Sequence, residues 1–172
     1  STGETETYNG TSWTEVANLN TSGHYMGASQ NGTSTAIIGF GGRDPGSDPS
    51  SVKTESWNGT SWTEVNDLNT GRFYPGGTGT QTAALGFGGG PGGPKKLTEE
   101  WDGTSWTEVA DLNTDRSVTG ANSGTQTESL TAGGQSPGAV ANTEFWNGTS
   151  WTEVADLASA NETIRGNGAS GS

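Results

Sequence analysis

The sequence predicts an all-β protein made of repeated antiparallel sheets, and three observations lead to this prediction. A nine-residue stretch, written WNGTSWTEV or with one change, recurs at residues 8–16, 57–65, 101–109 and 146–154. The apolar runs between these copies alternate apolar and small residues and are too short for helices. Turn-forming Asn-Gly and Gly-Gly pairs separate the runs. Together they indicate short strands joined by tight turns.

The repeat has a regular length. The second Trp of each copy stands at Trp13, Trp62, Trp106 and Trp151, in steps of 49, 44 and 45 residues. A period near 45 indicates stacked supersecondary units. We expect one domain over residues 1–172, with units at about 1–21 (partial), 22–66, 67–110, 111–155 and 156–172 (partial).

Each full unit begins with two predicted strands. The first, as in "HYMGAS" or "FYPGGT", is rich in Gly, Ala and Ser, as expected where several copies crowd around a central axis. The second, "AIIGF" or "AALGF", places apolar residues on one face at period two. A glycine doublet follows the second strand in every full unit: Gly41 and Gly42, Gly88 and Gly89, Gly133 and Gly134.

The recurring stretch predicts the third and fourth strands as a hairpin around Asn-Gly or Asp-Gly. A four-residue loop would oppose Trp57 and Trp62 directly, whereas a two-residue loop would place Trp57 opposite Thr60. The sequence leaves both open. The structural aromatic residues of these hairpins are Trp13, Trp57, Trp62, Trp101, Trp106, Trp146 and Trp151.

The Asn-Gly-Thr triplets at Asn9, Asn31, Asn58 and Asn147 are also N-glycosylation sequons. Asp102 replaces Asn in the third hairpin, which keeps the turn and removes the sequon. We therefore interpret the motif as a turn.

This pattern resembles the kelch repeat of β-propellers. The glycine doublet, the Trp that opens the fourth strand and the spacing W..V..L…R at Trp62–Arg72 and Trp106–Arg116 carry the resemblance. The segment NGTSWTEVADLNT is similar to segments of kelch-type proteins of marine phages and marine bacteria. The chain departs from the pattern at His24, at Arg165 and in "TAGG". The resemblance implies a β-propeller of four-stranded antiparallel blades.

About four units are visible, and one strand of the fourth is missing, because the chain opens in a third strand and its final residues match a first strand. Three explanations remain: an excerpt of a longer repeat protein, a strand supplied by a second chain, or an incompletely closed ring. We expect the excerpt, and after it an oligomeric ring or fibre.

The composition of the chain disfavours several classes of function. The net charge of −12 disfavours nucleic acid as a partner, and no apolar run is long enough to insert into a membrane. The chain has no Cys and one His, so we expect no enzyme, no cofactor and no metal site. Glycosidase chemistry, which needs two carboxylates, is a remote alternative. Most acidic residues recur in every unit, which indicates a scaffold role.

Positions that break the repeat are better binding candidates. The longest loop carries Arg43, Asp44 and Asp48, whose spacing is not that of an EF-hand calcium site. The remaining candidates are Tyr25, Arg72, Tyr74, Lys95, Lys96 and Arg116.

We therefore expect a non-enzymatic structural or interaction propeller outside the cell or on a virion surface, for example a phage appendage acting in assembly or adhesion. Its expected partners are other copies of itself or other virion proteins. The alternative is a lectin-like module that binds a cell-surface glycan.

Overall fold

The computed structural model describes residues 3–43, 50–90, 95–117 and 121–162, and these residues form strands and turns. One two-stranded sheet contains β1 (Thr5–Tyr8) and β2 (Trp13–Val16). The first complete sheet contains β3 (Gly27–Ala28), β4 (Ile37–Phe40), β5 (Thr54–Trp57) and β6 (Trp62–Glu64). No helix among the described residues is long and apolar enough to span a membrane.

Two further four-stranded sheets follow. One contains β7 (Gly76–Thr80), β8 (Ala83–Phe87), β9 (Thr98–Trp101) and β10 (Trp106–Glu108). The other contains β11 (Ala121–Gly124), β12 (Ser129–Ala132), β15 (Thr143–Trp146) and β16 (Trp151–Val154). A small hairpin of β13 (Gln135–Ser136) and β14 (Gly138–Ala139) lies between β12 and β15 in the sequence.

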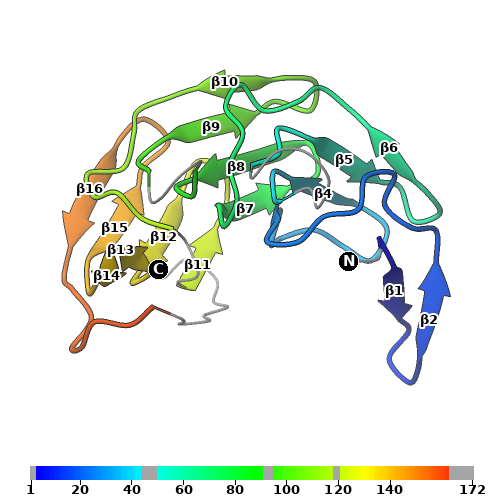
Figure 1. Ribbon diagram of the computed structural model, residues 1–172, viewed down its shortest axis with the longest axis horizontal. Helices are drawn as coiled ribbons and strands as arrows, with labels where there is room; N and C mark the ends of the chain where they lie inside the picture. The colour runs from blue at the N-terminus through cyan, green and yellow to red at the C-terminus, as the bar shows by residue number, and fades with distance from the viewer. Residues whose placement is uncertain (1–2, 44–49, 91–94, 118–120, 163–172) are drawn as a thin grey trace.

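The sheets follow one another along an open arch (Figure 1). Strands β7 and β11 lie on its inner side and β10 and β16 on its outer side, while the β1–β2 hairpin and the sheet containing β16 form its two ends. This arrangement confirms the predicted all-β, propeller-like class with incomplete closure. The predicted terminal first strand falls largely within residues 163–172, outside the described residues.

The hairpin between the third and fourth strands has a four-residue loop. Trp57 stands directly opposite Trp62, with ring centroids 5.4 Å apart. The side-chain oxygen of Asn58 accepts hydrogen bonds from the backbone N–H groups of Thr60 and Ser61, both at 2.9 Å. Gly59 provides the positive φ, +91°. The side chain of Asp102 binds its own loop in the same way, as the turn interpretation requires.

The small residues of the first strands allow close packing on the inner side. A Cβ atom on Gly77 in β7 would lie 2.4 Å from the carbonyl oxygen of Ala28 in β3. It would also lie 2.8 Å from Cζ of Phe40. Only glycine fits at this position, which agrees with the crowding predicted around the axis.

The hydrophobic core lies between consecutive sheets. One cluster contains Ile38, Phe40, Leu68, Ala84, Trp101 and Trp106, and the next contains Leu85, Phe87, Leu112, Trp146 and Trp151. Each joins a second-strand Phe to a fourth-strand Trp of the following sheet, edge to face, at 4.8 Å for Phe40–Trp106 and 4.9 Å for Phe87–Trp151. Each sheet therefore depends on its neighbour for burial, as expected for a repeat fold.

Candidate functional site

A buried glutamate links the third strand of each complete sheet to the segment that leads into that sheet. Glu99 in β9 is fully buried, and its carboxylate accepts hydrogen bonds from the backbone N–H and side-chain amide of Asn69 at 2.8 and 2.9 Å. Glu55 receives the corresponding bonds from Asn20, and Glu144 receives them from Asn113. The Leu-Asn-Thr segment that precedes each complete sheet thus holds the third strand of that sheet.

Two of these glutamates also bind an arginine. Nη2 of Arg72 lies 2.5 Å from Oε1 of Glu99, and Nη2 of Arg116 lies 2.8 Å from Oε1 of Glu144. All four side chains are fully buried. Burial lowers the pKa of Arg72, and Glu99 opposes this shift. The structure thus differs from the expectation that Arg72 and Arg116 bind an external ligand, because both guanidinium groups are buried and their Nη atoms donate to acceptors of the protein interior.

A second contact crosses every sheet boundary and was not anticipated from the sequence. Nε1 of the fourth-strand Trp donates to Oγ1 of the third-strand Thr in the preceding sheet. The three bonds are Trp62 to Thr5 at 3.2 Å, Trp106 to Thr54 at 3.1 Å and Trp151 to Thr98 at 3.1 Å. The signal was present in the sequence, since Thr precedes Glu at the start of every third strand.

At each end of the arch, one member of this Trp–Thr hydrogen bond lacks its partner: the Trp donor at one end and the Thr acceptor at the other. Trp13, the equivalent donor in β2, is 64% exposed, and Tyr8 opposite it is 50% exposed. The equivalent acceptor in β15 is Thr143, whose Oγ1 is buried without a hydrogen-bond partner. One end therefore presents an exposed aromatic pair, and the other contains a buried acceptor that is unsatisfied.

The loops at one face bring together several predicted binding residues. Tyr25 and Tyr74 lie with ring centroids 4.1 Å apart, and His24 and Phe73 each make an edge-to-face contact with the Tyr that follows. A hydrogen bond with Tyr25 raises the pKa of Tyr74. We call His24, Tyr25, Phe73 and Tyr74 the aromatic cluster. Arg43 pairs with His24 through the backbone at its edge.

The two tyrosines of the aromatic cluster have a strained backbone. Tyr25 has φ of 62° and Tyr74 has φ of 55°, and they are the only non-glycine residues with positive φ in the described part of the chain. A bulky residue in this region costs roughly 1–2 kcal/mol. Strain of this kind is often found at binding sites.

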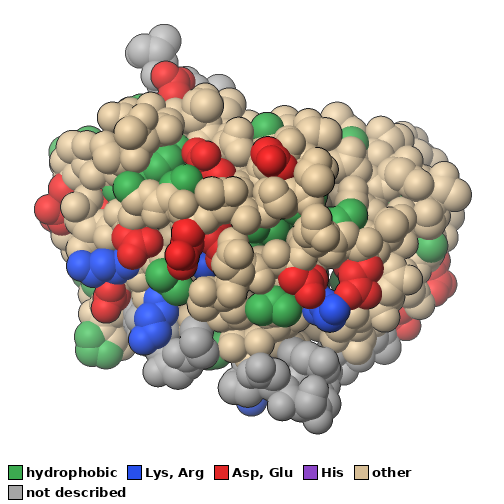
Figure 2. Space-filling view, turned by 90° about the horizontal axis from the view of Figure 1, so that it is seen from above, with side chains coloured by type: hydrophobic (Ala, Val, Ile, Leu, Met, Phe, Trp, Pro, Cys, Tyr) green, Lys and Arg blue, Asp and Glu red, His purple; other side chains and the backbone are tan. Residues whose placement is uncertain are grey.

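The other predicted binding residues lie elsewhere. Lys95 forms a backbone bridge with Arg116, at the boundary between the sheets that contain β9 and β15. Lys96 is exposed, and its carbonyl oxygen accepts the backbone N–H of Leu112. Asp44 and Asp48 lie outside the described residues. In the view of Figure 2, acidic side chains are scattered over the surface and are not gathered into one patch.

No group of three His, Asp or Glu side chains among the described residues is arranged to hold a metal ion. Comparison with protein-family models found no match to the chain. Comparison with curated proteins found no significant match either.

Proposed function

We propose that the chain is a structural, interaction-forming propeller unit of kelch type that associates head to tail with another copy of itself. The proposal rests on one observation, the Trp–Thr contact that joins consecutive sheets. Its donor is exposed at Trp13, and its acceptor is unsatisfied at Thr143. A second copy provides a Thr143 acceptor for Trp13 and a Trp13 donor for Thr143. The same Trp–Thr hydrogen bond already occurs three times within the chain.

Packing energetics favour such an association. The aromatic residues equivalent to Tyr8, namely Trp57, Trp101 and Trp146, are at most 2% exposed, and Trp106 and Trp151, equivalent to Trp13, are 5% exposed. Covering Tyr8 and Trp13 to the same degree removes a large apolar surface from water. We place such an assembly outside the cell or on a virion surface, and this placement rests on the resemblance of the repeat to kelch-type proteins of marine phages.

Sedimentation velocity over a concentration series tests this proposal. We expect the chain to associate as concentration rises and Trp13→Ala to shift association to higher concentration by at least about tenfold, a loss of roughly 1.4 kcal/mol. Gly138→Ser is the matched control, because no atom lies within 4 Å of an added Cβ there. A monomer at every concentration, or equal association of Trp13→Ala and the wild type, would contradict the proposal.

A second candidate function is glycan binding at the aromatic cluster. The specific observation in its favour is the strained, closely stacked pair Tyr25 and Tyr74, of which Tyr25 is 47% exposed. A glycan array with wild-type protein and with Tyr25→Ala and Tyr74→Ala tests it. Binding that disappears in both variants supports the candidate, and no binding to any glycan removes it.

A further inference from the structure

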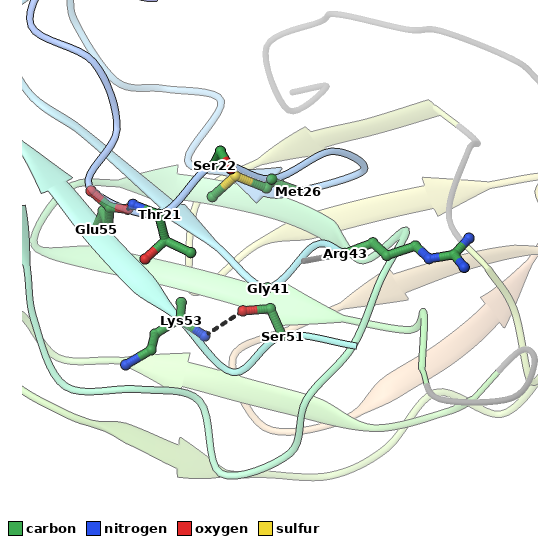
Figure 3. Close-up of a pocket in the computed structure, with 9 residues that line it drawn as sticks. Thr21, Ser22, Met26, Gly41, Arg43, Ser51, Lys53 and Glu55 are labelled. Atoms are coloured by element: carbon green, nitrogen blue, oxygen red, sulfur yellow. Dashed lines mark hydrogen bonds between the residues drawn. The ribbon is translucent and has the colours of Figure 1, made fainter. Parts of the chain in front are cut away.

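The complete sheet nearest the N-terminus contains a small cavity where the other two complete sheets contain an arginine. The cavity is shallow and partly open, and the empty space of about 230 Å³ in this region includes open solvent. Its lining includes Gly23, Gly41, Lys53 and Glu55. Met26 lines it too, and Figure 3 shows this side chain near Thr21 and Ser22.

In the other two complete sheets, the equivalent residues bind the guanidinium group of an arginine. Nη1 of Arg116 donates to the carbonyl oxygens of Gly133 and Asn142, both at 3.0 Å, while Nη2 donates to Glu144. In the preceding sheet, Nη1 of Arg72 donates to the carbonyl of Leu97 at 2.9 Å. One carboxylate and two backbone carbonyls therefore form a repeated guanidinium site.

The first sheet keeps the acceptors and lacks the donor. Glu55 is 1% exposed and still accepts the N–H groups of Asn20 at 2.9 Å and of Thr21 at 2.8 Å. Gly41 and Lys53 occupy the positions of Gly133 and Asn142. The position of the arginine, two residues after the Thr of Leu-Asn-Thr, is Gly23. Among the described residues, Glu55 is thus a buried carboxylate that forms no ion pair.

The basic side chains at the cavity do not replace the missing arginine. Nζ of Lys53 pairs with Glu64 and with Asp67, on the solvent side of β5. Figure 3 shows the side chain of Arg43 extending away from Glu55. The lining is adaptable, since Met26 is flexible and its Sδ lies 3.6 Å from where a Cβ on Gly23 would stand.

We propose that this cavity is a binding site for the guanidinium group of an arginine that the first sheet does not itself provide. A buried carboxylate without a cation is costly, and a guanidinium group fits one carboxylate and two carbonyls better than an ammonium group does. The proposal does not depend on head-to-tail association, because it concerns the loop face of one sheet and not the ends of the arch.

Calorimetric titration of the whole chain with ethylguanidinium tests the site. We expect one binding site, with ethylammonium binding at least about tenfold more weakly because it cannot donate in a plane to three acceptors. Gly23→Arg supplies the guanidinium internally and should abolish binding while raising Tm. Gly138→Arg adds the same charge at an open position and should bind as the wild type does. Equal affinity for both cations, or undiminished binding to Gly23→Arg, would overturn the proposal.

Two further measurements sharpen the result. Arg116→Gly should create a second site of the same design and raise the stoichiometry from one to two; if this variant does not fold, Gly23→Arg still decides. Free arginine and arginine capped as an acetyl amide distinguish the source. Tighter binding of the capped form assigns the site to an arginine within a polypeptide, and tighter binding of the free form assigns it to the amino acid. Binding of neither contradicts the proposal.

Discussion

Nε1 of Trp151 donates a hydrogen bond to Oγ1 of Thr98, 53 residues earlier and in the preceding sheet, at 3.1 Å. Trp106 and Thr54 repeat this contact at 3.1 Å over 52 residues. The bond joins the outer strand of one sheet to the third strand of its neighbour, beside the edge-to-face contact of Phe87 and Trp151. It therefore fixes the relative position of consecutive sheets, which the hydrophobic contacts alone leave less defined.

Thr98→Val and Thr143→Val form a matched pair that isolates this bond. Thr98→Val leaves a buried indole N–H without an acceptor, so we expect the free energy of unfolding to fall by about 1–3 kcal/mol. Thr143→Val removes an oxygen that has no partner, so the stability of the monomer should stay the same or rise. Urea denaturation at low protein concentration measures both. Equal losses in the two variants would contradict the assignment.

Arg72→Met should be among the most destabilising substitutions. It leaves the carboxylate of Glu99 buried without its cation, for which we expect a loss of about 3–5 kcal/mol. The double variant Arg72→Met/Glu99→Gln removes the uncompensated charge and should recover part of this loss. Denaturation curves of the two variants provide the comparison, and a double variant less stable than Arg72→Met would refute the explanation.

Asp102 gives the turn of the third hairpin a titratable side chain, where the other hairpin turns have Asn. Hydrogen bonds from the backbone N–H groups of Ser105 and Thr104 lower the pKa of Asp102 below its ordinary value of 3.8. Because the pKa is lower in the folded state, this stabilisation is present above pH 3.8 and is lost as pH falls through the folded-state pKa. Asp102→Asn keeps the turn without the charge, so the Tm difference between wild type and variant should shrink on acidification. A difference independent of pH would argue against this.

Tyr25→Gly and Tyr74→Gly should separate binding from stability. Glycine relieves the positive φ, roughly 1–2 kcal/mol, while losing ring contacts that contribute about 0.5–1.5 kcal/mol. The two effects nearly cancel, so the free energy of unfolding should change by less than about 1 kcal/mol. A large loss of stability would show that the tyrosines serve the fold, which would remove the structural argument for a binding role.

The fold followed from the sequence because the period, the glycine doublets and the Trp pairs are local signals repeated in every unit. The loop length between Trp57 and Trp62 did not, since Asn-Gly fits both a two-residue and a four-residue loop. The hydrogen bonds that Oδ1 of Asn58 accepts from the backbone N–H groups of Thr60 and Ser61 decide the loop length, and their geometry cannot be read from the sequence.

The roles of the arginines were harder to predict. Arg72 and Arg116 recur with the repeat, which is a scaffold signal, yet their partners Glu99 and Glu144 lie 27 and 28 residues away, and only the folding of each unit into a sheet brings them together. The aromatic cluster was anticipated as loop aromatics, but its stacking depends on the contact between successive inner strands. The orphan oxygen of Thr143 has no local sequence signal at all.

Cysteine cross-linking tests head-to-tail association most directly. Nδ2 of Asn66 donates to the carbonyl of Thr104 in the next sheet at 2.8 Å, and the equivalent positions at the two ends of the arch are Ala155 and Thr11. The chain has no cysteine, so Thr11→Cys/Ala155→Cys carries only two thiols, and Asn66→Cys/Thr104→Cys is the intramolecular control. With a short thiol cross-linker, we predict covalent dimers and longer ladders for the end pair and cross-linked monomer for the control. An end pair that cross-links only within one chain, or not at all while the control reacts, would contradict head-to-tail association.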